Sequence, residues 1–213
     1  MKIIACIFML IDHIGSVLFP DVIVFRVIGR IAFPLFAFLI AYGAAKTRNI
    51  YKYFARLLIF AFISQIAISL TSWNISLYPL NIFFTLAAGV LSIILIRLTI
   101  EKKNPLFPVA LAVLLISALL IPFDYGIAGI LLIVMLWAAP QMTYLTRTAS
   151  LLVFNVLLTF FGTGNIQWFS IAALLFIFFF KDEHLKIPKW ERWAFYVFYP
   201  LHLVILHLIN LLF

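Results

Sequence analysis

The sequence predicts an all-α protein: a polytopic bundle of about nine transmembrane helices that forms a single domain over residues 1–213. Three observations lead to this prediction. Hydrophobic residues make up 67% of the chain and charged residues only 10%, whereas a soluble domain is about half apolar and a quarter charged. The apolar residues gather in runs long enough to enter a bilayer. The 15 basic residues lie mostly in the short loops between these runs.

The predicted helices follow the apolar runs, with boundaries near residues 3–20, 27–45, 54–71, 80–98, 105–122, 126–139, 148–162, 166–180 and 194–212. The sixth and seventh runs are short, and the break between them at Ala139-Pro140 is the weakest. If these two runs form one re-entrant element, the chain has about eight spans instead.

The basic residues predict the orientation. With nine spans, all of them except Arg26 and Arg30 fall on one side of the membrane. The positive-inside rule assigns that side to the cytoplasm. The N-terminus is therefore predicted inside and the C-terminus outside. Because topology accounts for the net charge of +8, no nucleic-acid partner is expected.

The N-terminal run is predicted to be a span and not a cleavable signal peptide, because no small-residue cleavage site follows it. The chain contains one cysteine, Cys6, so no internal disulfide is expected.

This first run carries two ionisable residues, Asp12 and His13. A helix rises about 1.5 Å per residue, so His13 is about 16 Å beyond Lys2, near the bilayer centre. Asp12 points about 100° away from His13 and shares a face with Ser16. Gly15 allows a second helix to approach closely. Ionisable groups at this depth usually mark a functional path, although an interhelical hydrogen bond that only stabilises the bundle is the alternative.

The second run contains Arg30 about one turn inside the outer boundary. A cation there needs an acidic partner, for which Asp12, Asp21 and Asp124 are the candidates. Pro34 removes a backbone hydrogen bond and is expected to kink the helix beside Arg30. The alternative is an arginine that snorkels to the interface.

Two further groups of polar residues are candidates for ligand binding. Lys52 and Arg56 lie four residues apart at the cytoplasmic edge, where they are suited to the phosphates of a nucleotide-like cofactor. Positive-inside loops look the same, so this signal is weak by itself. Asn81 and Thr85 share a face near the outer side, suited to a substrate or to ordinary helix packing.

The last run contains Tyr199 and His202, which share a face, and His207. Of the two histidines, His202 is the better candidate because of its Tyr-Pro context. No metal-binding motif is present, since His202 and His207 do not lie on one helical stripe. A histidine held in the membrane with an acid nearby suits general-base catalysis. Proton-coupled transport uses the same residue types, and the residues alone leave these alternatives open.

Strings at residues 2–15, 26–36, 53–65, 81–86 and 198–203 resemble the TraX family, in order along the chain. The spacing of Lys2 and His13 resembles, more distantly, the first helix of the acyltransferase-three and heparan glucosaminide acetyltransferase group. The resemblance implies a membrane acetyltransferase that takes acetyl-CoA from the cytoplasm, with His13 as catalytic base and Asp12 as its electrostatic or orienting partner. It further implies the cell membrane of a bacterium as the location.

The predicted donor-binding residues are Arg30, Arg48, Lys52, Arg56, Gln65, Asn81, Tyr199 and His202. An amine or hydroxyl acceptor, such as a pilin N-terminus, a peptide or a glycan, is expected at the outer side near Arg30, Asn81 and Asp124. The loop at residues 181–186 lacks the Asn-Gly turn of the family. The rival functions are a small proton-coupled transporter and a non-catalytic assembly factor for a surface filament.

Overall fold

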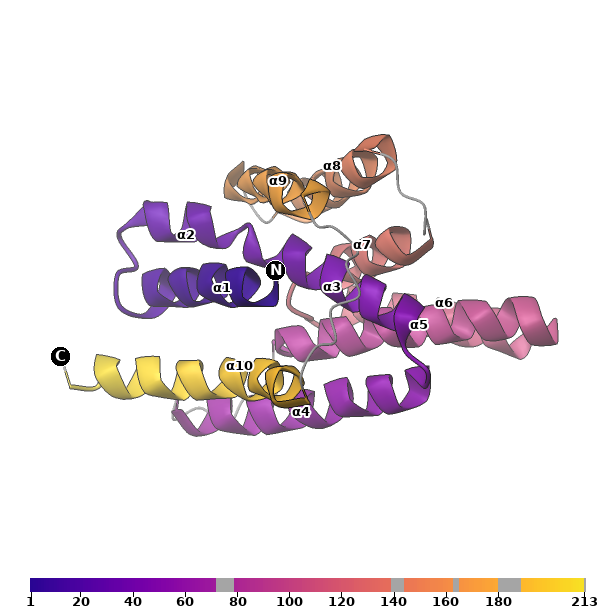
Figure 1. Ribbon diagram of the computed structural model, residues 1–213, viewed down its shortest axis with the longest axis horizontal. Helices are drawn as coiled ribbons and strands as arrows, with labels where there is room; N and C mark the ends of the chain where they lie inside the picture. The colour runs from indigo at the N-terminus through magenta and orange to yellow at the C-terminus, as the bar shows by residue number, and fades with distance from the viewer. Residues whose placement is uncertain (72–78, 139–143, 163–164, 180–188, 213) are drawn as a thin grey trace. The chain divides into compact units, whose positions relative to one another are not determined.

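The structure is a computed structural model, and it describes residues 1–71, 79–138, 144–162, 165–179 and 189–212 (Figure 1). Most of these residues are helical, and their only pairing of β type is an isolated bridge between Leu80 and Phe123. Four helical stretches are long and apolar enough to cross a membrane: Ile23–Lys46, Ile50–Ser69, Ile82–Lys102 and Trp193–Asn210. The prediction of an all-α protein with membrane-spanning helices is confirmed.

The elements in chain order are α1 (Lys2–Val17), α2 (Ile23–Gly29), α3 (Ala32–Lys46), α4 (Ile50–Thr71), α5 (Ile82–Lys102), α6 (Leu106–Leu120), α7 (Gly126–Ala138), α8 (Tyr144–Phe160), the 3₁₀ helix η1 (Asn165–Ala172), α9 (Ala173–Phe178) and α10 (Lys189–Asn210). Each predicted apolar run coincides with one helix or with two consecutive helices. The break at Ala139-Pro140 and the loop at residues 181–186 lie outside the described residues.

The second predicted helix is divided into α2 and α3 at Arg30 and Ile31. Pro34 explains the division, because it has no N–H to donate to the carbonyl four residues earlier, which belongs to Arg30. The amide of Ile31 donates instead to Ile28 O, 3.3 Å away, in a tighter turn. Pro34 itself lies in the first turn of α3, where proline is tolerated.

The chain divides into two compact units, and each is described by itself. The first unit consists of Met1–Phe36, Ile66–Ile75 and Thr143–Phe213. Within it, α1 packs against α2 and α10, while η1 packs against α2, α8 and α9. The second unit consists of Ala37–Gln65 and Ser76–Met142. The expectation of one domain over residues 1–213 stays a prediction.

Helix α5 is the buried centre of the second unit and packs against α6 and α7. Gly89 on α5 makes the contact with α7 close, because a Cβ at this position would lie 2.6 Å from the Cδ1 atom of Ile133. Ala88, Ala118 and Ile130 join the three helices in one apolar cluster. Small residues thus allow these helices to approach, as is usual for helices in membranes.

Candidate functional site

Asp12 on α1 is the counter-ion of two arginines, Arg26 on α2 and Arg30 directly after it. Arg26 donates to its Oδ2 atom at 2.7 Å, and Arg30 donates to its Oδ1 atom at 2.5 Å. The amide of Arg30 still donates to the carbonyl of Arg26 at 3.2 Å, so the two side chains lie one turn apart and both reach the same carboxylate. Of the three acids that the sequence offers to Arg30, the structure pairs it with Asp12.

Two glycines allow α1 and α2 to lie close enough for these ion pairs. A Cβ on Gly29 would be 2.3 Å from the Cβ atom of Asp12, and a Cβ on Gly15 would be 2.4 Å from that of Phe25. The expectation that Gly15 admits a second helix is therefore confirmed, and α2 is that helix. The hydroxyl of Ser16 donates to the carbonyl of His13 at 3.1 Å, so its described bond is to the main chain of α1.

A third side chain, Gln167 on η1, extends this cluster. Its Oε1 atom lies 3.5 Å from Nη1 of Arg30, and the residue is 3% exposed. A guanidinium only donates hydrogen bonds, so the amide oxygen must face it and the amide nitrogen must point elsewhere. That nitrogen is buried and has no hydrogen-bond partner within the described residues. Gln167 is not among the residues predicted from the sequence, although a glutamine inside an apolar run is a usable signal.

His13 faces a different helix, α10, where it contacts His202. The Nδ1 atom of His13 lies 2.7 Å from Nε2 of His202, and the two ring planes are inclined by 28° with their centroids 4.9 Å apart. Nδ1 of His202 lies 2.7 Å from the carbonyl oxygen of Phe198, one turn earlier. The ring of Tyr199 is close to both imidazoles, with centroids 6.0 Å from His13 and 5.8 Å from His202.

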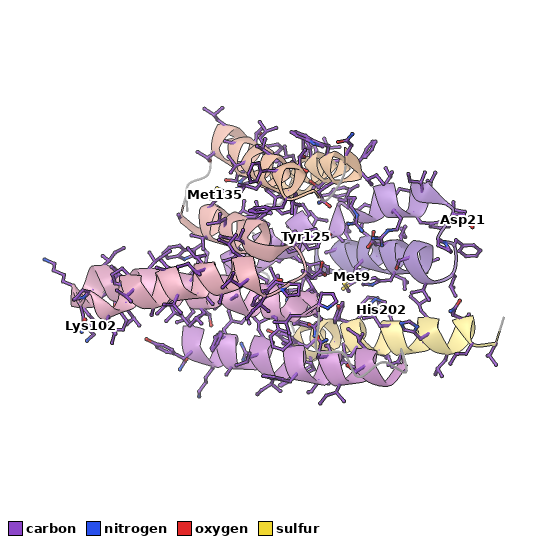
Figure 2. All side chains as sticks on the ribbon, turned by 180° about the vertical axis from the view of Figure 1, so that it is seen from behind. Met9, Asp21, Lys102, Tyr125, Met135 and His202 are labelled. Atoms are coloured by element: carbon purple, nitrogen blue, oxygen red, sulfur yellow. The ribbon has the colours of Figure 1, made fainter. Side chains whose placement is uncertain are left out.

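This histidine pair is set in an apolar part of the first unit. His202 is 5% exposed and Tyr199 is 6% exposed. Met9, one turn before His13 and therefore on the same face of α1, is also buried. Figure 2 shows α10 with His202 running beside α1, on which Met9 is labelled.

The adjacency of Asp12 and His13 in sequence therefore does not bring their side chains together. Consecutive helical residues point about 100° apart, so α1 presents Asp12 to α2 and His13 to α10. The hydrogen-bond partner of the His13 ring among the described residues is His202 and not Asp12. The catalytic roles expected for Asp12 and His13 stay predictions.

Gln65 and Asn81, two predicted donor-binding residues, lie together in the second unit, where they hold the start of α5. The Asn81 side chain accepts from the amide of Phe83 at 3.0 Å as an N-cap. Its Nδ2 atom donates to Oε1 of Gln65 and to the carbonyl of Ala61, both at 2.8 Å. Both residues are buried, and these bonds give them a structural role. Their role in binding a donor stays a prediction.

Arg48, Lys52 and Arg56 lie near the N-terminus of α4, in the second unit. Asn49 caps this helix by accepting from the amide of Lys52 at 2.9 Å. Arg48 and Lys52 are exposed. The guanidinium of Arg56 lies 5.8 Å from the ring of Tyr53, and its Nε atom is buried without a hydrogen-bond partner among the described residues. These cations lie where the helix dipole also favours an anion.

The fold and the polar pairs define a class: an all-α protein with helices long and apolar enough to span a membrane, in which ionisable side chains pair between helices. The chain belongs to the TraX family, described as "TraX protein", which it matches over residues 1–210.

Two curated proteins are similar to this chain. The "Probable fimbrial assembly protein FimC, serogroup H1" of Dichelobacter nodosus is 26% identical, with 97% of this chain and 92% of that protein aligned. "Uncharacterized protein RP591" of Rickettsia prowazekii (strain Madrid E) is 47% identical over 53 residues, which are 24% of this chain and 21% of that protein. No solved structure matches the chain.

Proposed function

We propose that this protein is a membrane-embedded acetyltransferase that moves an acetyl group from cytoplasmic acetyl-CoA to an amine or hydroxyl acceptor at the outer side. The observation that carries the proposal is the histidine pair between α1 and α10. No described residue hydrogen-bonds to Nε2 of His13, while its Nδ1 is engaged by His202. An imidazole held by one nitrogen, with the other available, is the arrangement that a general base needs.

The chemistry of the transfer follows from this arrangement. The acceptor nitrogen or oxygen attacks the thioester carbonyl carbon, and His13 takes the proton that the acceptor loses. The carbon–sulfur bond then breaks, and the proton passes from His13 to the departing thiolate, which leaves as the thiol of coenzyme A. This direct route needs no acyl-enzyme. A route through acetyl-His13 is distinguished by radioactive labelling of the protein in the absence of acceptor.

Arg48, Lys52 and Arg56 are the proposed contacts for the donor phosphates. They combine three positive charges with the N-terminus of a long helix, which favours anions independently of side-chain charge. Arg56 adds a buried N–H without an acceptor among the described residues. A phosphate oxygen would satisfy this donor. The predicted topology places all three at the cytoplasmic face, where acetyl-CoA is available.

Arg30, Tyr199 and the two structural residues Gln65 and Asn81 fit donor binding less well. The bonds of Arg30 to Asp12, and those between Gln65 and Asn81, occupy polar atoms that a donor would need. His202 and Tyr199 contact His13, which connects them with the proposed chemistry.

The acceptor class is taken from the relatives. The similar protein of Dichelobacter nodosus is described as a probable fimbrial assembly protein, which supports a pilus-related role. A pilin N-terminus is the acceptor that this role favours, with other peptides and glycans as alternatives. The spacing of Lys2 and His13 supports a relationship to the wider acyltransferase group.

Donor binding is tested by the melting temperature of the detergent-purified protein with acetyl-CoA and with coenzyme A. A ligand at a hundredfold excess over its Kd stabilises the native state by about 2.7 kcal/mol. We expect an upward shift that is lost in the Lys52→Gln/Arg56→Gln variant. The matched control is Lys102→Gln/Lys103→Gln, which removes two exposed cations predicted on the same side. No shift with either ligand at millimolar concentration contradicts the proposal.

Transfer itself is tested by the release of free thiol from acetyl-CoA when a peptide with a free N-terminal amine, or glucosamine, is added. We expect His13→Ala to lower kcat by about 10² to 10⁴, because general-base catalysis contributes that much. The variant should retain the melting-temperature shift with acetyl-CoA. Full transfer by His13→Ala would show that His13 is not the base.

A non-catalytic role in filament assembly is the second candidate, and the name of the Dichelobacter relative favours it. This role predicts that pilus assembly survives the loss of His13 and that acetyl-CoA does not bind. A proton-coupled transporter is likewise expected not to bind acetyl-CoA. The sequence lacks the paired half-repeats of many transporters, which is an argument against this function. Counting surface pili on cells that carry His13→Ala separates the assembly role from the enzyme.

A further inference from the structure

We infer that His202 is a positioning residue that fixes the tautomer and orientation of His13, so that Nε2 of His13 is the atom that takes the acceptor's proton. This inference rests on the proposed acetyl transfer. The sequence predicts that His202 binds the donor. We assign it instead to proton transfer, in which it acts through its contact with His13.

The direction of each hydrogen bond follows from the groups involved. The carbonyl oxygen of Phe198 can only accept, so the Nδ1 atom of His202, 2.7 Å away, must carry a proton. In a neutral imidazole the other nitrogen is then a lone pair, and Nε2 of His202 is an acceptor. The Nδ1 atom of His13, 2.7 Å from it, must be the donor. His13 is thereby left with its lone pair on Nε2.

Packing restricts the rings as well as the protons. The ring of Phe198 stacks on that of His202 with a centroid distance of 4.8 Å. Tyr199 packs at the edge of His202. Because His202 is 5% exposed, water competes little for its Nε2 atom. The His13 ring is therefore held by its hydrogen bond to a second imidazole that is itself packed in place.

Asp12 is poorly placed for the same task. Its two carboxylate oxygens accept from Arg26 and Arg30, and these two cations outnumber the one acid. In serine hydrolases an acid orients the base. Here the second imidazole occupies the equivalent place, and it can also share charge with the base. When Nε2 of His13 accepts a proton, the Nδ1 proton can move to Nε2 of His202, so that the positive charge spreads over both rings.

The proton step balances without any further reactant. The acceptor loses one proton to Nε2 of His13 as its bond to the acetyl carbon forms. The same proton returns to the sulfur as the carbon–sulfur bond breaks. His202 gains and loses a proton only by exchange with Nδ1 of His13, and both residues end the cycle neutral.

The tautomer is tested first, by ¹⁵N NMR of the full chain with labelled histidine and without acetyl-CoA. Signals are assigned by comparison with His13→Ala and His202→Gln. We expect His13 to carry its proton on Nδ1 in the wild type and in His202→Gln, whose amide oxygen can accept the same bond. In His202→Leu, which offers no acceptor, a mixture of tautomers is expected. A wild-type His13 protonated on Nε2 overturns the inference.

Transfer rates provide the second readout, with the same peptide acceptor and acetyl-CoA. We expect His202→Leu to lower kcat on the order of 10²-fold with little change in KM for acetyl-CoA, and His202→Gln to recover part of that rate. The matched control is His207→Leu, which removes a histidine five residues away on the same helix and should retain the wild-type rate. Wild-type kcat in His202→Leu overturns the positioning role.

The two readouts separate this inference from the proposed function. If the protein transfers no acetyl group, the NMR result still establishes or refutes the hydrogen-bond order. If transfer occurs but His13 carries its proton on Nε2, the proposed function is supported and the positioning role of His202 is wrong. If His202→Leu does not fold, the wild-type spectrum and His202→Gln still give the answer.

Discussion

Asp12 and His13 are neighbours in the chain, yet each is bound by a different helix. Asp12 accepts from Arg26 on α2 and from Arg30 at its end, whereas His13 contacts His202 on α10. The Asp12 carboxylate is thus the centre of a positively charged cluster, and the His13 imidazole belongs to an aromatic one. Because the two residues have different partners, we expect replacement of Asp12 and replacement of His13 to cause different defects.

Asp12→Asn is expected to act on stability. The change leaves two guanidinium groups without a counter-charge in a site where the Asp12 side chain is only 14% exposed. Removing one partner from such a cluster costs about 2 kcal/mol or more. The melting temperature in detergent should fall clearly.

Asp21→Asn, which changes an exposed acid between α1 and α2, is the matched control and should melt as the wild type does. An Asp12→Asn variant that melts normally but has lost acetyl transfer would return Asp12 to the catalytic role that the sequence favours.

At the scale of elements, the contact between α1 and α2 depends on the absence of a side chain at Gly29. A Cβ there would lie 2.6 Å from the Cα atom of Asp12, which is backbone and cannot rotate away. The two helices would have to separate, and the ion pairs between them would lengthen. Helix propensity favours alanine over glycine at such a position, but the close packing of α1 against α2 leaves no room for its side chain.

Gly29→Ala is therefore expected to destabilise the protein. Alanine favours the helix by about 0.5 to 1 kcal/mol over glycine, but overpacking costs about 1 to 3 kcal/mol. The clash involves backbone, so the second effect should win. Thermal melting in detergent measures the result.

The control for this variant is Ile28→Ala on the same helix, where the side chain is 36% exposed and a smaller effect is expected. A Gly29→Ala protein more stable than the wild type would show that α1 and α2 are not in close contact.

At the scale of the whole molecule, the distribution of basic residues predicts which loops face the cytoplasm. Glu101 lies at the end of α5, beside the predicted inner loop, and Phe161 follows α8 at the predicted outer side. Both side chains are exposed. The two positions therefore report on opposite faces of the membrane without removing a basic residue.

Single cysteines at these positions, in a Cys6→Ser background, test the topology with a membrane-impermeant maleimide. We expect Phe161→Cys to react in intact cells and Glu101→Cys to react only after permeabilisation. The Cys6→Ser protein without a new cysteine is the control for background labelling. The opposite pattern would invert the predicted orientation, and acetyl-CoA would then have to bind at the other face.

The sequence by itself determined the fold class, the positions of the helices and the family. Apolar run length and the placement of basic loops are local properties, and each predicted run coincides with one or two described helices. Even the break beside Arg30 was readable, because the missing N–H of Pro34 acts within one turn. The Asn81 N-cap was readable in part, since asparagine before an apolar run often begins a helix.

Only the tertiary structure decided the pairings. The sequence offers three acids to Arg30 and no means to choose between them. It does not connect His13 with His202, which lie 189 residues apart, and it gives no reason to single out Gln167. These contacts depend on the distance and rotation between packed helices, which small residues such as Gly15 and Gly29 set and which hydropathy does not encode. The distinction between Asp12, which pairs with two arginines, and His13, which pairs with His202, is therefore a property of the packing.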